Sequence, residues 1–523
     1  MGGSMQSHRL VNTLRNTPRV LLAVGAVTLV GAFGAPGIAG ASTKAAPSVR
    51  STAAHVSLFN AGRVHFSHGS AAPRHHAAHR SARPETPAVL YVNGSTGSDN
   101  TSCRLHSHPC ATISYAILQS PGGTPTTINV AGGNYPEQVV VTTGLNLTIV
   151  GAGQSATTIE PSTLATADPD TDSSYNQYAI VDAQPGSKVK LEDLTINGSA
   201  AQGQFTGCGP GFDGVYFHDA KGKMTDVTVT YVELSQSDFG CQDGLGIYAA
   251  ADSGKVTKVT MNSVIVNNYD KNGITCDDAG TTCKVNNSTV TGIGETTLIG
   301  QNGIQGYGAG SISLDSDTVT GNSYDGPDYV ATGLLLYDNA TTTATHVTAT
   351  SNDVDIYAGN DGDGPATNTI SLSDNNANNA TNYNGLGGVG IGLDSGVAGS
   401  VTGNTATGDV GGGIYEWGSS GMTIESNTAS SDYLGIYIGG EGSDGLGSTS
   451  MTVSQNTVSR ESYDGILADT DATGNNFTSN IAKHDLNYAY QDLSTGSETA
   501  GTANTWTGNE CTPSADSNPE GLC

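Results

Sequence analysis

A short pattern recurs ten times in the sequence and constrains the fold more than any other feature. In each copy a turn residue, usually Gly, precedes an aliphatic residue that opens a strand-like run. These aliphatic residues are Val215, Ile247, Ile274, Ile304, Leu334, Ile356, Ile391, Ile414, Ile436 and Ile466, spaced by 22 to 35 residues. A loose but persistent period of about 28 residues indicates stacked units, because one unit of this size cannot bury its own apolar side.

Within each repeat, aliphatic residues alternate with Thr, Ser and Asn, which predicts strands with one buried and one hydrated face. Gly and Asn gather at the bends, where they tolerate left-handed backbone conformations. Asn404, Asn427, Asn456 and Asn480 recur at one bend of successive repeats. We predict that their side-chain amides bond to one another in a ladder. The alternative is an exposed polar binding face.

The ordered part of the chain resembles a known superfamily. The segments "YVNGSTGSDNTSC", "HPCATISYAI", "INVAGGNYPEQVVV" and "LTIVGAG" are similar to the N-terminal cap and first coils of the right-handed parallel β-helix superfamily, the pectin-lyase-like fold. The resemblance covers Val89 to Asp492. It implies an all-β, single-stranded right-handed parallel β-helix of roughly 12 to 14 coils with a short N-terminal capping helix. Known members include lyases, hydrolases, alginate-modifying enzymes, tailspikes and adhesins, so the motifs specify the fold more than the function.

Five segments follow from composition and periodicity. We expect a signal peptide (1–41), a basic His-, Ala- and Pro-rich linker (42–86), an N-terminal cap (87–125), the β-helix (126–495) and a C-terminal cap or tail (496–523). Arg9, Arg15 and Arg19 precede an apolar run that is too short for a comfortable membrane span. This predicts a secreted or cell-surface protein, with an uncleaved anchor as the alternative. The linker's histidines suit a transition metal, but a flexible basic spacer is the favoured interpretation.

Charge is distributed very unevenly along the chain. Residues 1–86 contain nine basic residues and one acidic residue, whereas residues 87–523 contain 11 basic and 47 acidic residues. Such a negative surface argues against nucleic acid as a partner. An acidic polysaccharide would need a bridging cation or a local basic patch. We expect a monomer.

Eight cysteines in an exported chain predict disulfides. The shortest loops join Cys103 to Cys110, Cys276 to Cys283 and Cys511 to Cys523, which leaves Cys208 with Cys241. The two-residue cysteine spacing typical of structural zinc sites is absent from the sequence.

Alternation also predicts which side chains point outward. If the ten repeated aliphatic residues face the core, the next residue and the one two positions later face out, on coils about 4.8 Å apart. We therefore predict an aromatic stripe that binds sugar rings, formed by Tyr216, Tyr248, Tyr307, Tyr337, Tyr357, Tyr415, Trp417 and Tyr437. The alternative is that these tyrosines stack on each other to support the sheet.

Acidic residues near this stripe are candidate catalytic groups. Asp213, Asp243 and Asp277 lie in successive repeats, and stacking would bring their carboxyl groups within the range that glycoside hydrolysis requires. Asp before Gly is also a common turn residue. Lys271 is the candidate base for elimination, and His218 with Tyr216 forms a second candidate pair.

Calcium is the one cofactor that the sequence suggests. Asp168, Asp170 and Asp172 alternate in "DPDTDSS", and Asp361 and Asp363 alternate in "NDGDG", a spacing that suits a hard cation. Together, the fold, the aromatic stripe and the candidate acids predict a protein that binds and cleaves extracellular polysaccharide as a lyase or hydrolase. The alternative is a non-catalytic surface, adhesive or structural β-helix.

Overall fold

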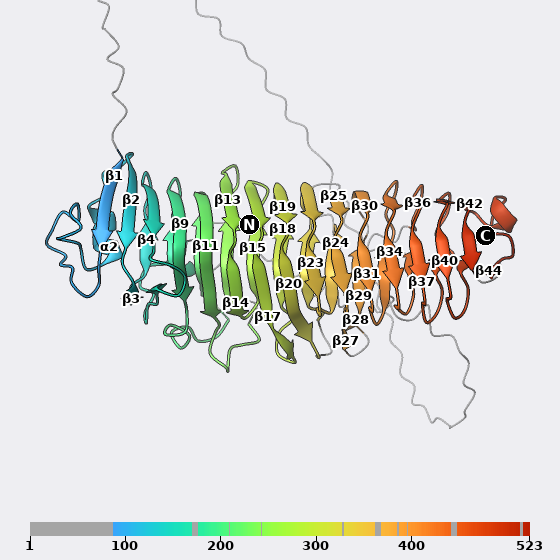
Figure 1. The fold of residues 1–523 in the computed structure, drawn as a ribbon, viewed down its shortest axis with the longest axis horizontal. Helices are drawn as coiled ribbons and strands as arrows, with labels where there is room; N and C mark the ends of the chain where they lie inside the picture. Colours follow the sequence, from blue (N-terminus) through green and yellow to red (C-terminus); the bar gives the residue numbers. More distant parts are fainter. Residues whose placement is uncertain are drawn as a thin grey trace, which may run out of the picture. The chain divides into compact units, whose positions relative to one another are not determined.

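The computed structural model describes residues 87–523, apart from residues 170–175, 209, 242, 327–328, 361–367, 384–385, 395, 441–446 and 513–515. All of these described residues belong to one compact unit. The predicted signal peptide and linker lie outside the described residues. In Figure 1 the strands succeed one another in chain order along a single axis.

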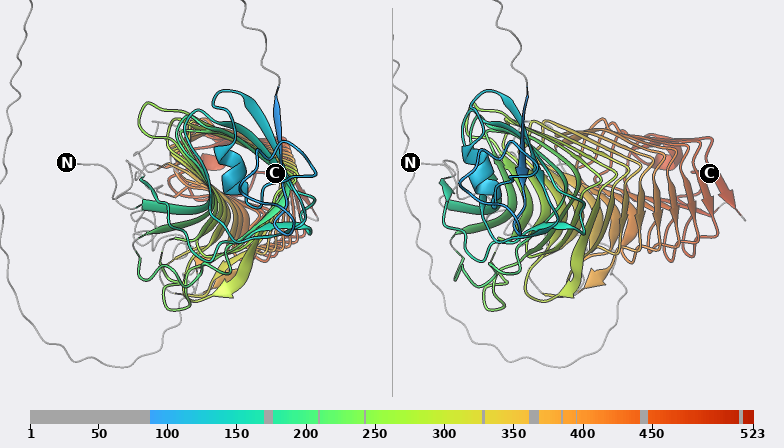
Figure 2. Two further views of the ribbon diagram at one scale, coloured as in Figure 1. Left: turned by 90° about the vertical axis from the view of Figure 1, so that its left-hand side faces the viewer. Right: turned by 60° about the vertical axis from the view of Figure 1, so that its left-hand side comes forward.

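Each coil consists of three short strands that pair with the equivalent strands of the next coil. One coil contains β12 (Leu245–Ala250), β13 (Thr257–Asn262) and β14 (Ile265–Tyr269). The next coil begins with β15 (Asn272–Asp277), which pairs in parallel with β12. Three walls of parallel strands result, which is the parallel β-helix that the repeats predicted (Figure 2).

The first wall is a 15-stranded sheet. Besides β12 and β15 it contains β4 (Val139–Val141), β8 (Asn176–Ala183), β10 (Gly211–His218), β18 (Asn302–Tyr307), β21 (Thr332–Tyr337), β24 (Val354–Gly359), β29 (Val389–Leu393), β32 (Gly412–Glu416), β35 (Ile436–Ile438), β38 (Ile466–Ala468), β41 (Tyr490–Asp492), β44 (Ser517–Asn518) and β7 (Asp168–Pro169), which pairs antiparallel with β8.

The second and third walls form one 27-stranded sheet, because the long strands β9 (Lys188–Asn197) and β11 (Lys221–Val232) contribute to both. The second wall also contains β1 (Ala88–Val92), β2 (Pro125–Val130), β5 (Asn146–Val150), β13, β16 (Thr281–Asn286), β19 (Ser311–Asp315), β22 (Thr341–Thr345), β25 (Asn368–Ser373), β30 (Val397–Thr402), β33 (Thr423–Glu425), β36 (Thr452–Ser454), β39 (Asn476–Thr478) and β42 (Thr505–Thr507).

The third wall also contains β3 (Gly133–Tyr135), β6 (Thr157–Ile159), β14, β17 (Thr289–Thr296), β20 (Thr318–Tyr324), β23 (Thr348–Thr350), β26 (Asn376–Asn378), β31 (Thr405–Thr407), β34 (Thr428–Ser430), β37 (Thr457–Ser459), β40 (Ile481–Lys483) and β43 (Glu510–Thr512). A hairpin of β27 (Asn382–Tyr383) and β28 (Leu386–Gly387) and a 3-10 turn (Thr499–Gly501) complete the described elements.

The register of the first wall confirms the repeat. All ten predicted aliphatic residues are direct neighbours in sequence order, from Val215 opposite Ile247 to Ile436 opposite Ile466. All ten are fully buried in the interior, where side chains from the three walls meet. The strict two-residue alternation of a strand explains this result, because one register shift would turn every such residue outward.

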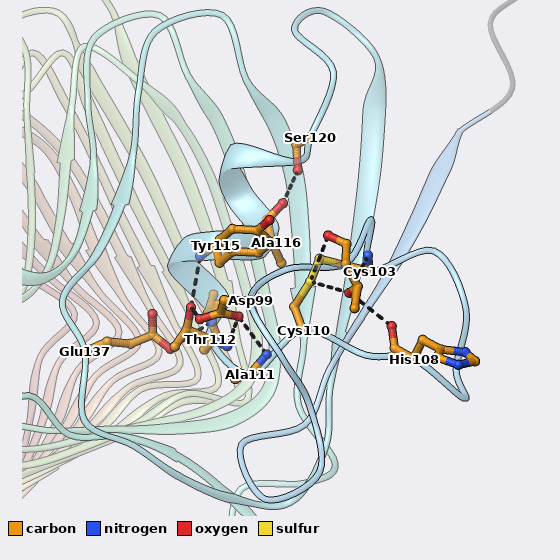
Figure 3. Close-up of a disulfide and its surroundings, with 12 residues drawn as sticks. Asp99, Cys103, His108, Cys110, Ala111, Thr112, Tyr115, Ala116, Ser120 and Glu137 are labelled. Carbon is orange, nitrogen blue, oxygen red and sulfur yellow. Dashed lines mark hydrogen bonds between the residues drawn. A yellow bond between two sulfur atoms is a disulfide. The ribbon is translucent and has the colours of Figure 1, made fainter.

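A short helix, α2 (Ile113–Leu118), lies at the N-terminal end of the stack (Figure 2). Ile113, Ala116 and Ile117 are its buried residues. The Thr112 hydroxyl accepts a hydrogen bond from the Tyr115 N–H, and the Glu137 carboxylate accepts from the first two N–H groups of the helix at 2.8 Å each. These acceptors satisfy the free donors of the helix start (Figure 3).

The described cysteines form the four predicted disulfides, Cys103–Cys110, Cys208–Cys241, Cys276–Cys283 and Cys511–Cys523. The first of these closes the loop that precedes α2 (Figure 3). The predicted asparagine ladder is also present. In each step the backbone N–H of one asparagine donates to the side-chain Oδ1 of the next. The three bonds run from Asn404 to Asn427, from Asn427 to Asn456 and from Asn456 to Asn480, each at 2.9–3.0 Å.

Candidate functional site

The predicted tyrosines lie on the outer side of the first wall. Tyr216 is opposite Tyr248, and Tyr415 is opposite Tyr437. They pack in clusters separate from the interior core. The rings of Tyr216 and Tyr248 stack at 4.9 Å with an interplanar angle of 14°. The shared outward face therefore agrees with the prediction.

The exposure of this stripe differs from the prediction. Five of its members are buried, namely Tyr216, Tyr248, Tyr337, Tyr415 and Tyr437, while Tyr307, Tyr357 and Trp417 are half-buried. Mutual stacking and neighbouring side chains take up most of the ring surface, so a wide hydrated aromatic platform is wrong for the five buried tyrosines. Their contact with a ligand stays a prediction.

A charged cluster surrounds His218, the last residue of β10. Its Nδ1 lies 3.1 Å from Asp168 Oδ2, and its Nε2 lies 3.0 Å from Asp252 Oδ1. His218 and Asp168 are buried, whereas the Asp252 side chain is 20% exposed. The His218 ring stacks on Tyr216 at 5.3 Å. The line from Asp168 through His218 to Asp252 therefore connects two buried side chains to a partly exposed one.

Two groups of this cluster have strongly raised pKa values. Burial alone would lower the pKa of His218, but its hydrogen bonds to Asp168 and Asp252 and their charges outweigh burial and raise the pKa to about 9. Asp182 pairs with Tyr216 in the register of β8 and β10. Burial, reinforced by the negative charge of Asp168, raises the pKa of Asp182 to about 7. Perturbed groups of this kind are typical of sites that exchange protons.

The same cluster contains the described residues best arranged for a cation. Ligand atoms of His218, Asp219 and Asp252 lie within 4.8 Å of one another. The Asp168 carboxylate on the other ring nitrogen would orient the imidazole, as carboxylates do behind metal-bound histidines. One nitrogen and two carboxylates suit a divalent cation.

Of the predicted calcium ligands, only Asp168 is described, and it contacts His218. Asp170, Asp172, Asp361 and Asp363 lie outside the described residues. The Asp168 contact could not be found from sequence, because it joins residues 50 positions apart through the antiparallel pairing of β7 with β8.

The other predicted catalytic residues have separate surroundings. Asp243 Oδ1 accepts hydrogen bonds from the N–H groups of Phe212 and Gly244, and burial raises its pKa to about 6. Lys271 Nζ donates to the Gly300 carbonyl at 2.6 Å, and burial lowers its pKa to about 8. Both groups have structural partners, as turn residues and buried cations require.

Asp213 and Asp277 lie on the first wall with His218. Asp213 is fully buried in β10, and half-buried Asp277 in β15 pairs in register with Tyr307. Their catalytic roles stay predictions.

Sequence reasoning missed a network of side-chain hydrogen bonds that joins β15, β18 and β21 of the first wall. The Asn302 side chain donates to Asn272 Oδ1 at 3.0 Å, Asn272 donates to Gln305 Oε1 at 2.9 Å, and Thr332 donates to Asn302 Oδ1 at 2.8 Å. The signal was available, because Asn272, Asn302 and Thr332 each precede the Gly of one repeat.

Among the described residues, no helix has the length and apolar character needed to cross a membrane. No curated protein sequence matches the chain. Residues 332–512 match the family model described as "Right handed beta helix region".

The chain is similar to solved structures of three different kinds. The mannuronan C-5 epimerase AlgE6 A-module of Azotobacter vinelandii matches at 13% identity and a TM-score of 0.44, over 77% of this chain and 94% of that chain. Pre-mature gene product 12 of bacteriophage phi29 matches at 12% identity and a TM-score of 0.51, over 75% of this chain and 53% of that chain. Tailspike protein 3 of bacteriophage CBA120 matches at 12% identity and a TM-score of 0.39, over 75% of this chain and 57% of that chain. At these identities the likeness concerns the fold alone.

Proposed function

With a right-handed parallel β-helix as its scaffold, we propose that this protein binds an extracellular polysaccharide on the first wall and cleaves it by proton transfer. The observation that carries the proposal is the line of Asp168, His218 and Asp252, which connects a buried carboxylate to a partly exposed one through a histidine. Such a line holds a proton in place and delivers it to a bound group.

In this proposal Asp252 is the group that reaches the sugar. His218 positions Asp252 and exchanges a proton with it, and Asp168 fixes the orientation of the imidazole ring. Asp182 stores a further proton, because its pKa of about 7 allows both forms at neutral pH. A divalent cation at His218, Asp219 and Asp252 would displace the proton shared by His218 and Asp252, so it would support binding of an acidic polymer in place of proton transfer.

The test compares variants of two His–Asp pairs in the same chain. We expect His218→Gln and Asp252→Asn to abolish cleavage of a panel of pectate, alginate, xylan and glucan, measured as new reducing ends and unsaturated products. His346 lies 3.5 Å from Asp315 on the exposed surface, so His346→Gln is the matched control and should cleave normally. Unsaturated products would identify a lyase, and saturated products a hydrolase. No cleavage of any polymer by the wild-type protein would refute the proposal.

A non-catalytic binding or structural β-helix is the second candidate, and the burial of five stripe tyrosines favours it. It predicts that no polymer is cleaved and that His218→Gln leaves glycan binding unchanged.

We further propose that the protein acts outside the cytoplasm as a monomer. Four disulfides fit an oxidising compartment. Mass spectrometry of the protein recovered from culture medium should find a mature chain that begins near Ser42. Recovery of the intact chain only from cytoplasm would contradict this.

A further inference from the structure

Four carboxyl groups, three of them buried and one half-buried, form a column along the C-terminal coils. Asp409, Asp432, Glu461 and Asp485 each lie two residues after a third-wall strand (β31, β34, β37 and β40). The backbone N–H of Asp409 donates to Asp432 Oδ1 at 2.8 Å, Asp432 to Glu461 Oε2 at 2.7 Å, and Glu461 to Asp485 Oδ1 at 3.0 Å. Each acid thus accepts a hydrogen bond from the coil before it. We call these four residues the carboxyl column.

The asparagine ladder of the same coils provides an internal comparison. Each asparagine also accepts a backbone N–H from the preceding coil, but its side-chain nitrogen donates as well. Asn427 Nδ2 donates to the Val401 carbonyl at 2.9 Å and to Asn456 Oδ1 at 3.0 Å. An ionised carboxylate performs the accepting role only, because it has no proton to donate.

The second oxygen of three column members is buried without a hydrogen-bond partner. These atoms are Oδ2 of Asp409, Asp432 and Asp485. They point at glycines of the first wall, since a Cβ added to Gly390, Gly413 or Gly465 would lie 2.5–2.8 Å from them. A buried oxygen of this kind is costly as an anion and much less so as a neutral hydroxyl.

The surrounding charges are negative. Asp355 acts on Asp409, and Asp464 acts on Asp485. The nearby Tyr415, Tyr433 and Tyr463 carry no positive charge, and the charges of exposed Arg460 and half-buried Lys483, the basic residues adjacent in sequence, do not contribute to the shifted pKa values of the column. Among the described residues, ion pairs are formed by His218 and His346, and neither touches the column. Burial and mutual repulsion raise the pKa of Asp409 to about 9, of Asp432 and Glu461 to about 8, and of Asp485 to about 6.

We propose that the carboxyl column is a proton-binding switch, whose bound protons hold the C-terminal coils together and whose loss opens them. A proton on Asp409, Asp432 or Asp485 removes the negative charge from its buried, unpartnered second oxygen. When the protons leave, acids on successive coils repel one another across about 4.8 Å.

The direction of the pH dependence follows from the raised pKa values. A group with a folded-state pKa above its unfolded value stabilises the fold fully below the unfolded pKa, near 4 for carboxyl groups. The column's contribution is therefore present at about pH 4 and is lost as pH rises through roughly 6 to 9, the range of the folded-state values.

The experiment compares wild type with Asp409→Asn/Asp432→Asn and with the exposed-acid control Asp315→Asn/Asp374→Asn. Infrared spectra at pH 7 should show absorption from protonated carboxyl groups in wild type and control, and the column variant should lose the part of this absorption that belongs to the two substituted groups. The urea midpoint of the wild type should fall steadily from pH 5 to pH 9, and the fall should be at least halved in the column variant.

Hydrogen exchange locates the effect and covers the case of a poorly folded variant. After correction for the intrinsic pH dependence, residues 405–492 of the wild type should lose at least tenfold protection between pH 5 and pH 9, whereas residues 125–160, which contain no buried carboxyl group, should keep theirs. Equal loss of protection in both regions, or equal infrared absorption in wild type and column variant, would overturn the proposal.

Discussion

Removal of a single ladder amide, Asn427→Ala, tests whether the asparagine ladder is a main source of stability. Asn427 is 1% exposed. Its Oδ1 accepts hydrogen bonds from the backbone and side-chain nitrogens of Asn404, and its Nδ2 donates to Val401 and Asn456. The substitution removes all four bonds and leaves the buried N–H of Asn404 without its acceptor.

The magnitude follows from these contacts. An unsatisfied buried N–H costs about 1–3 kcal/mol, and each of the three other lost bonds about 1 kcal/mol, so the free energy of unfolding should fall by about 5 kcal/mol. Asn376, in the third wall, is exposed. Asn376→Ala is therefore the control and should change stability by less than about 0.5 kcal/mol.

Urea unfolding followed by the fluorescence of Trp506, which is buried against Phe477, measures both variants. Hydrogen exchange of the neighbouring coils should be run in parallel, because repeat arrays need not unfold in two states. Equal midpoints for Asn427→Ala and Asn376→Ala would refute the argument that the ladder carries this energy.

Three further predictions follow from described contacts. Gly413→Ala places a methyl group 2.8 Å from both Asp432 Oδ2 and the Gly435 carbonyl, so it should lower the free energy of unfolding by about 2 kcal/mol, whereas Gly122→Ala, with open space around it, should be neutral in the same urea assay. His218→Gln should cost about 2 kcal/mol at pH 6; because the folded pKa of His218 is raised to about 9, this difference should shrink as pH rises through 9, and a constant difference in calorimetry would contradict it. The double substitution Cys276→Ser/Cys283→Ser removes a disulfide between residues seven positions apart. It should lower the free energy of unfolding by about 2 kcal/mol, measured as a lower melting temperature than that of the wild type.

The walls of the fold were predictable from sequence because each coil repeats the same local requirement. The residue before Ile391, Ile414 and Ile466 must be Gly, because a side-chain Cβ at this position would collide with the carboxyl group of a column acid. The aliphatic residue after it must face the interior. Local chemistry of this kind recurs in every coil, so a loose period was enough to fix the register.

The carboxyl column also left a signal that the sequence reasoning did not use. The segments "NTATGD", "NTASSD", "NTVSRE" and "NIAKHD" each place a ladder Asn five residues before a column acid. Alternation predicts the strand between them, and the acids then share one bend. Taken one at a time, each acid is an ordinary turn residue.

The candidate site was less predictable for a physical reason. Periodicity decides which side of a strand a residue faces, and it correctly placed Tyr216 and His218 on the outer side. It does not decide what covers that side. The partners of His218 come from β7 and from Asp252, which lie outside the repeated strands, so their approach depends on tertiary structure.

The coils differ greatly in length, yet their strands stay aligned. Ile414 and Ile436 pair after 22 residues, and Ile356 and Ile391 pair after 35. The added residues of the longer coil fall between Gly359 and Asn368 and between Asn378 and Val389, on either side of the first wall. Loops there can be exchanged or lengthened without disturbing the framework, so the choice of ligand could diversify in evolution, or be engineered by loop grafting, while the scaffold remains constant.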